Sequence, residues 1–117
     1  MLKRRLPRPT PEQQARQDAI RAIGCIACII EGAPVFCGDP TIHHQTSSGR
    51  TISQDATVCL GRWHHQGVCM DNFTTSKMTS VFGPSLAKEL RRFAATYGNN
   101  VELLAIQNAY LEDGKLC

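Results

Sequence analysis

The N-terminal part of the chain has the apolar pattern of one amphipathic helix. Four small or aliphatic side chains share one side of this helix: Ala15, Ala19, Ile20 and Ile23. Thr10 is a good N-cap, Pro11 suits the first helical position, and Gln13 completes a capping box. Because Gly24 follows directly, the pattern predicts a helix that starts at Pro11 and ends at Gly24.

Two short strands are predicted in the middle of the chain. Residues 41–44 read Thr-Ile-His-His and residues 57–60 read Thr-Val-Cys-Leu, with the β-branched side chains that strands favour. A loop containing Gly and Pro over residues 31–40 precedes the first strand, and a flexible turn over residues 47–50 lies between the two. Residues 63–66 then predict a short helix that Gly67 ends.

The last third of the chain is predicted to be helical. Pro84 opens a helix that Gly98 closes and whose apolar face is formed by Leu86, Leu90, Phe93 and Tyr97. Asn99 or Asn100 caps a final helix with the apolar residues Leu103, Leu104, Ile106, Tyr110 and Leu111. These helices are expected to pack the domain, and with the central strands they indicate a single α+β domain.

The basic residues are concentrated at the N-terminus. The net charge is +3 for 117 residues, but residues 1–24 hold six Lys or Arg against two acidic residues, whereas the remainder has a net charge of −1. We interpret residues 1–9 as a flexible basic arm and residues 10–117 as the folded domain. Candidate phosphate contacts are Lys3, Arg4, Arg5 and Arg8 of the arm, with Arg50 and Arg62 near the strands. A solvated tail without a binding role is the alternative for the arm.

The composition is that of a globular protein, with 42% hydrophobic and 20% charged residues. No run of about 18 apolar residues that would span a membrane is present. The charged start lacks the apolar segment of a secretory signal, so we expect a cytoplasmic protein. Because cytoplasmic thiols stay reduced, the six cysteines favour a metal site over a disulfide scaffold.

Cys25 and Cys28 form a Cys-x-x-Cys motif. Two thiolates at this spacing chelate one soft cation, and a structural zinc site needs two further Cys or His ligands. His64 is the expected third ligand. A thioredoxin-like redox pair would need a βαβ setting, which the pattern does not predict, and plain buried cysteines remain a second alternative.

The four histidines occur as two adjacent pairs. His43 and His44 end a strand, where neighbouring side chains point to opposite faces, so that one imidazole can face a metal and the other a water near a phosphate. An imidazole, with a usual pKa of about 6.5, suits a general base near neutral pH. On the predicted helical turn, His64 and His65 diverge by about 100°, which allows His64 to face the cysteines and His65 the catalytic centre. Structurally satisfied histidines are the alternative.

In their order and spacing these motifs resemble the HNH (ββα-metal) endonucleases. The matching segments are Cys25-x-x-Cys28, Ile42-His43-His44, Gly49-Arg50 and the run from Asp55 to Gly67. More narrowly, residues 20–112 are similar to the phage and prophage recombination enhancement function nucleases, which are described as RecA-dependent. The resemblance implies a small ββα-metal core with a zinc knuckle, flanked by N-terminal and C-terminal helices. It also implies metal-dependent hydrolysis of DNA phosphodiester bonds in a bacterial host cell, with a RecA-type recombinase filament as a partner.

The resemblance further implies roles for individual residues. His44 matches the general base, His43 and His65 match ligands of a catalytic Mg²⁺ or other divalent cation, and Cys25, Cys28 and His64 match structural zinc positions. A zinc-stabilised nucleic-acid-binding module without catalysis would need only the last three. A recombination accessory protein without catalysis is compatible with either set.

Two positions depart from the family pattern. Many members carry an Asn before the second strand that orients the catalytic His, and here Gln54-Asp55 lies there instead. Asp55 can accept a hydrogen bond from an imidazole and is therefore a candidate catalytic residue. Zinc-binding members usually carry Cys where this chain has Gly61. Cys59 is the expected replacement as fourth zinc ligand, with Cys37 and Cys69 as alternatives.

Overall fold

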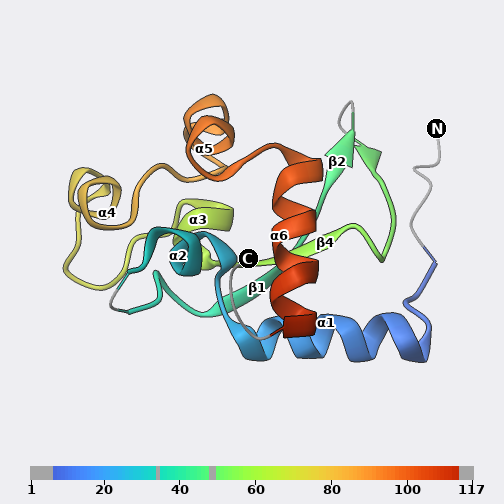
Figure 1. Cartoon of the computed structure of the whole chain (residues 1–117). Helices are drawn as coiled ribbons and strands as arrows, with labels where there is room; N and C mark the ends of the chain where they lie inside the picture. The colour runs from blue at the N-terminus through green and yellow to red at the C-terminus, as the bar shows by residue number, and fades with distance from the viewer. Residues whose placement is uncertain (1–6, 34, 48–49, 114–117) are drawn as a thin grey trace.

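The computed structural model describes residues 7–33, 35–47 and 50–113, which form a mixed helix and small-sheet architecture, in agreement with the predicted α+β class (Figure 1). The elements are α1 (Pro11–Ile23), α2 (Ile26–Glu31), β1 (Pro40–His44), β2 (Thr46–Ser47), β3 (Arg50–Thr51), β4 (Thr57–Gly61), α3 (Arg62–Gln66), α4 (Thr75–Phe82), α5 (Leu90–Tyr97) and α6 (Asn100–Asp113). Most of the predicted basic arm, residues 1–6, lies outside the described residues. Among the described helices, none is both long enough and apolar enough to cross a membrane.

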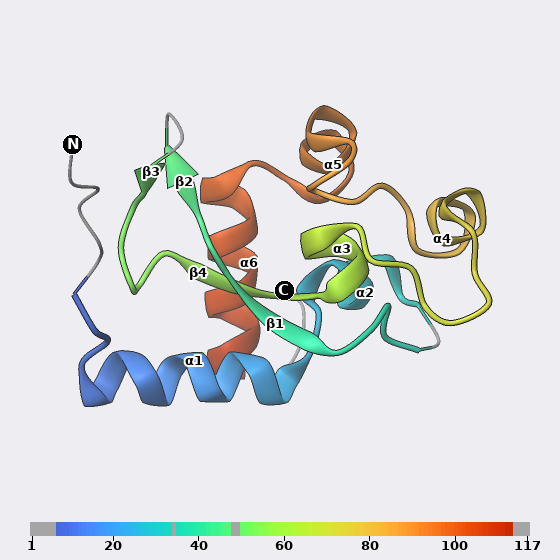
Figure 2. The same cartoon turned by 180° about the vertical axis from the view of Figure 1, so that it is seen from behind.

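The antiparallel pair β1–β4 lies at the centre of the molecule. Its register places Ile42 opposite Cys59 and His44 opposite Thr57. All five residues of β4 are buried, because α1, α2, α3 and α6 all contact this strand. Figures 1 and 2 show α6 crossing the strand pair and α1 running along it, with α2 and α3 together at the far end of β4. Both predicted central strands are confirmed.

The two small sheets belong to one interrupted hairpin. Beyond β1 the chain continues into β2, which pairs with β3 through Thr46 opposite Thr51. Between the sheets, the backbone of Gln45 donates to the Ala56 carbonyl and accepts from the Ile52 amide. Residues 53–55 therefore protrude as an excursion opposite Gln45, and the Ser53 hydroxyl accepts from two amide groups of this turn. The β2–β3 pair replaces part of the turn predicted over residues 47–50.

Helix α1 forms as the sequence predicts. The Thr10 hydroxyl accepts from the Gln13 amide, and the Gln13 side chain accepts from the Thr10 amide, which completes the capping box. Gly24 ends the helix at φ 100°, a conformation that side chains with a Cβ rarely adopt. The ring of Phe36 packs against this glycine, and a Cβ there would lie 2.5 Å from the Phe36 Cζ.

The C-terminal third differs from the prediction in two places. Helix α4, capped by Thr74, was not predicted, although Met78 and Phe82 bury one face of it at helical spacing. The helix predicted from Pro84 begins only at Leu90. The intervening segment instead packs on α3, where the Leu86 amide donates to the His64 carbonyl at 2.8 Å. Because of this contact with α3, the residues from Pro84 to Glu89 are not helical, although their apolar spacing predicts a helix.

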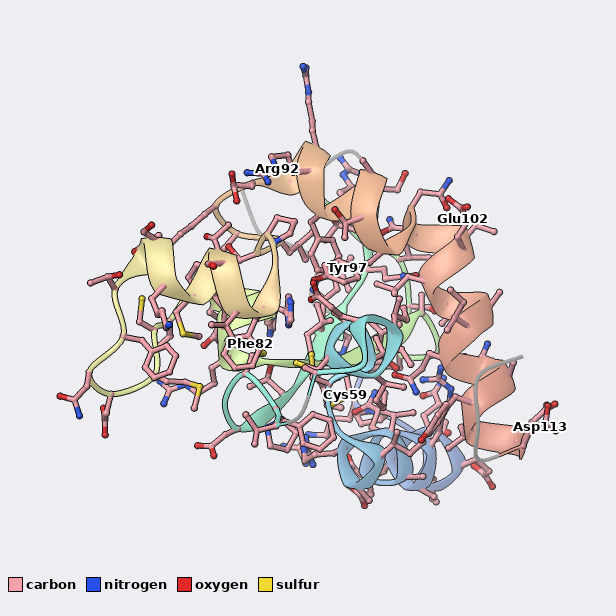
Figure 3. All side chains as sticks on the ribbon, turned by 60° about the vertical axis from the view of Figure 1, so that its left-hand side comes forward. Cys59, Phe82, Arg92, Tyr97, Glu102 and Asp113 are labelled. Carbon is pink, nitrogen blue, oxygen red and sulfur yellow. The ribbon has the colours of Figure 1, made fainter. Side chains whose placement is uncertain are left out.

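The core lies between the central strands and α2, α3, α4 and α5. Its largest members are the aromatic residues Trp63, Phe82, Phe93 and Tyr97, packed with Val58 and Leu60 from β4. Figure 3 shows Phe82 and Tyr97 in the interior, whereas Arg92 and Glu102 project from the surface. The final helix α6 is confirmed, and Asn99 caps it by accepting from the Glu102 amide.

Candidate functional site

Three cysteines and one histidine meet in the core. Cys25 stands at the N-terminal end of α2 and Cys28 lies one turn later, so both thiols face the same side. The loop before β1 brings in Cys37, and α3 brings in His64. All four side chains are buried, and their ligand atoms lie within 4.8 Å of one another.

The distances in this Cys3His cluster fit a tetrahedral zinc site. His64 Nδ1 lies 3.3, 3.6 and 3.0 Å from the Sγ atoms of Cys25, Cys28 and Cys37, respectively. The Sγ atoms of Cys25 and Cys37 are 3.9 Å apart. Ordinary zinc bond lengths in a tetrahedron separate nitrogen from sulfur by about 3.5 Å and two sulfurs by about 3.8 Å. The cluster can therefore hold a zinc ion with little rearrangement.

The hydrogen bonds of His64 leave the correct nitrogen free for a metal. Its Nε2 lies 2.7 Å from the Phe82 carbonyl oxygen, which can only accept, so Nε2 carries the proton. The lone pair is then on Nδ1, the atom that faces the three thiols. Tyr97 supports this arrangement, since its hydroxyl lies within hydrogen-bonding distance of both Phe82 O and the Glu31 carboxylate. Such outer contacts are typical of metal-binding histidines.

The electrostatics of the cluster also favour a cation. Burial raises the pKa of the Cys25 thiol to about 12, and hydrogen bonds with the other two thiols raise the pKa of Cys28. Hydrogen bonds from Cys25 and Cys28 lower the pKa of Cys37, so the anionic charge collects on that sulfur. Burial opposes protonation of His64, but its contacts with Cys28 and Cys37 raise its pKa to about 10. A divalent ion would displace the remaining thiol protons and the proton on His64 Nδ1, and it would neutralise the buried negative charge.

The fourth ligand position belongs to Cys37, and the expectation for Cys59 is corrected. Cys59 is buried in β4, but its neighbours Val58 and Leu60 face the cluster side of the strand and its thiol faces the other side, toward α1. Cys69 lies near the Thr75 hydroxyl, at 3.7 Å, away from the cluster. A Cβ placed on Gly61 would lie 2.5 Å from Cys37 Sγ. The thiol of Cys37 therefore occupies the space into which a side chain at position 61 would project.

A second group of side chains gathers where β1 meets α3. The rings of His43 and His65 are 5.0 Å apart and nearly edge-to-face. The Thr41 hydroxyl donates to the Leu60 carbonyl at 2.6 Å, so it accepts from His65 Nδ1 at 2.7 Å. His65 Nε2 is thus left with a lone pair. Thr41 has no role in the sequence prediction, although it lies two residues before His43 and hence on the same strand face.

His43 and His65 are both held in the neutral form. Burial, and next the repulsion that protonated His65 or His44 would exert, lowers the pKa of His43 to about 4. Burial and the charge of His44 lower the pKa of His65. His43 also lines a cavity of about 310 Å³ whose other walls include Phe93 and Leu103. Neutral imidazoles are the form that binds a metal ion.

His44 contacts Gln54, not Asp55. Its Nε2 lies 2.9 Å from Gln54 Oε1, and Gln54 projects from the excursion over residues 53–55. The Asp55 carboxylate instead accepts from the Gln13 side chain at 2.9 Å. Where many family members use an Asn, this chain therefore uses Gln54 to contact His44. Gln54 reaches His44 because residues 53–55 protrude from the hairpin.

The candidate DNA-binding residues lie on the surface or outside the described part. Arg8, Arg50 and Arg62 are exposed, whereas Lys3, Arg4 and Arg5 fall among the residues whose structure is not described. Arg62 begins α3, the helix that also carries His64 and His65. The exposed guanidinium of Arg62 therefore lies on the same short helix as His64 of the Cys3His cluster and His65 of the second group.

The sequence profile of the family described as "Recombination enhancement, RecA-dependent nuclease" matches residues 9–112, most of the chain. The chain belongs to this family. The predicted resemblance to the RecA-dependent nucleases is thereby confirmed. No curated protein matches the chain. In this family member, the matched range contains both the Cys3His cluster and the three histidines outside it.

The Cys3His cluster predicts different outcomes for two buried cysteines. Cys37→Ser should abolish stoichiometric zinc binding and lower the melting temperature by more than about 10 °C, because the free energy of metal binding contributes to folding. Cys59→Ser should retain one zinc per chain. Elemental analysis after gel filtration, combined with thermal unfolding, measures both. Full zinc content in Cys37→Ser would contradict the assignment.

The close approach of Gly61 to Cys37 predicts a rescue. Gly61 has φ −66° and ψ 166°, an extended conformation open to any residue. Gly61→Ala alone should weaken zinc binding, since its Cβ would collide with Cys37 Sγ. The double variant Cys37→Ala/Gly61→Cys should recover one zinc per chain, because the new thiol enters the vacated space. Zinc content of the double variant no higher than that of Cys37→Ala would refute the exchange.

Proposed function

We propose that this chain is a metal-dependent DNA endonuclease of the HNH type, with a ββα-metal core formed by β1, β4 and α3. Family membership supports a nuclease acting in recombination. The observation that carries the proposal is the arrangement of His43, His44 and His65. The hydrogen bonds that His44 donates to Gln54 and His65 donates to Thr41 determine which ring nitrogens of these two histidines are free. A module that only binds nucleic acid has no need of these three side chains.

His44 is the proposed general base. Gln54 Oε1 can only accept, so His44 Nε2 donates to it and Nδ1 keeps the lone pair. Nδ1 takes a proton from water as the water oxygen attacks phosphorus, and the bond from phosphorus to the leaving 3′ oxygen breaks. Exposed arginines and the basic arm hold the phosphate backbone, which carries no sequence information, so cleavage is sequence-tolerant.

His65 and His43 are the proposed holders of a catalytic divalent cation. Such an ion, when bound, supplies Lewis-acid stabilisation of the charge on the phosphate and on the leaving oxygen. Thr41 orients His65 Nε2 for this purpose. Two imidazoles suit a transition metal better than Mg²⁺, which would depend mainly on oxygen ligands from water and from the substrate.

The proposed partner is DNA engaged by a RecA-type filament, in keeping with the description of the family. A short basic arm can neutralise only about four phosphates, so intrinsic DNA affinity is expected to be weak and strongly salt-dependent. Recruitment by the filament would then supply the missing affinity. Cleavage is therefore best measured both with and without a recombinase filament.

Removal of the base and removal of a metal ligand should have different consequences. His44→Ala should lower the cleavage rate by roughly a hundredfold to ten-thousandfold at every metal concentration while zinc content and DNA binding are retained. His65→Ala should recover part of its activity at high divalent metal, because it weakens binding of the ion. The measurement is plasmid cleavage over Mg²⁺, Mn²⁺ and Zn²⁺ series, with the exposed Gln66→Ala as control. Wild-type cleavage by His44→Ala would favour the binding-module alternative.

The arm predicts a salt effect on binding alone. The arm charges are best removed by substitution and not by deletion, because the carbonyl of Pro7 accepts a hydrogen bond from Gln54. Replacing Lys3, Arg4, Arg5 and Arg8 by Gln should reduce the log–log salt slope of DNA binding by about 3 to 4. The rate at saturating DNA should not change. If the salt dependence of DNA binding did not change, the arm would make no phosphate contacts.

A further inference from the structure

Helix α1 directs hydrogen-bonding side chains at the first residue of β4 and at the segment before it. Gln13 binds Asp55, Arg16 binds Thr57, and Gln17 binds Gln54. Gln17 is 6% exposed and shares its helix face with the buried Ile20. An apolar side chain would be usual at such a position, because a buried amide destabilises the fold unless it is hydrogen-bonded.

The amide of Gln17 makes two contacts with one residue. Its Nε2 lies 3.2 Å from the backbone oxygen of Gln54 and 3.0 Å from Gln54 Oε1. The opposite end of the Gln54 side chain donates from Nε2 to the Pro7 carbonyl at 2.9 Å. Gln54 Oε1 is therefore shared between Gln17 on one side and His44 on the other.

Two carbonyl groups fix the direction of this chain of hydrogen bonds. The backbone oxygen of Gln54 can only accept, so the group that Gln17 presents to it is its NH2. The carbonyl of Pro7 can only accept as well, so Gln54 turns its NH2 that way and its oxygen toward His44. An amide flip of Gln54 would set NH2 against NH2 at Gln17 and carbonyl against carbonyl at Pro7. Either mismatch is unfavourable, so His44 meets an acceptor.

We infer that Gln17 is a positioning residue for the proposed cleavage: together with the Pro7 carbonyl it holds the amide of Gln54 in one orientation, so that His44 carries its proton on Nε2 and presents Nδ1 to water. The inference rests on the proposed function for its catalytic consequence, but the position of the proton is a property of the free protein. Gln17 itself touches neither the substrate nor the reacting atoms.

A purely structural role for Gln17 makes a different prediction. Satisfying the buried carbonyl of Gln54 requires only the 3.2 Å contact and would affect stability alone. The 3.0 Å contact with Oε1 is the one that connects Gln17 to His44. The two roles are therefore separated by the tautomer of His44 and not by the melting temperature.

The test uses Gln17→Met, which keeps the side-chain length and removes the donor. At pH 8, long-range ¹H–¹⁵N NMR spectra of wild-type protein should show His44 protonated on Nε2, whereas the variant should show a mixture of both tautomers. The cleavage kcat should fall about ten- to a hundredfold with KM for DNA little changed. Gln14→Met, at an exposed position of the same helix, is the matched control.

A double-mutant cycle isolates the path through Gln54. If Gln17 acts through Gln54, then Gln17→Met should have no further effect on the tautomer or on kcat in a Gln54→Leu background. Additive losses of kcat would overturn the inference, as would a wild-type tautomer in Gln17→Met. If Gln17→Met does not fold, Gln17→Ala replaces it, since the space it leaves admits water to the Gln54 carbonyl. Failure of the wild-type protein to cut DNA both with and without a recombinase filament would refute the proposed function, while the NMR result would still decide what Gln17 does.

Discussion

The imidazole of His64 is the contact on which most of the structure depends. Its Nδ1 faces three thiols and its Nε2 donates to the carbonyl that ends α4, so a single ring joins the knuckle, the loop before β1, α3 and α4. Tyr97 extends the same network into α5. A zinc ion held at this junction would add its binding free energy to the stability of the fold.

The same helix couples the cluster to the proposed chemistry. His64 and His65 are consecutive residues of α3, a helix of only five residues, and they point in directions about 100° apart. Fixing the ring of His64 therefore also fixes the backbone from which His65 projects. On the opposite strand, Thr41 holds His65 from the side of β1. The position of one proposed metal ligand is thus set by a buried cluster that need not take part in catalysis.

Local sequence signals predicted the parts of the fold that local interactions decide. The capping box of α1, both central strands, α3 and α6 all follow from capping, β-branching and helical spacing. The start of α5 was wrong, because Pro84–Glu89 makes tertiary contacts with α3 that no periodicity encodes. Helix α4 was missed even though Thr74 and the spacing of Met78 and Phe82 signal it.

Among the site residues, the divergent directions of His64 and His65 were predictable from helix geometry. The choice of Cys37 over Cys59 depends on the approach of a distant loop to Gly61, which the sequence does not reveal.

The use of Cys37 in place of a cysteine at position 61 changes the order in which the domain can assemble. A ligand at position 61 would be local to His64, whereas Cys37 is 27 residues away and can meet it only after the intervening chain has closed into a loop. A metal ion bound first by Cys25 and Cys28 would gain its other two ligands only after two loops close, one that brings in Cys37 and one that brings in His64. Once formed, the site cross-links the segment between Cys28 and Cys37, which contains little regular structure beyond the end of α2. Zinc would therefore act here as a reversible covalent-like tether, and its departure would free this segment while the capped helices α1 and α6 kept their own local hydrogen bonds.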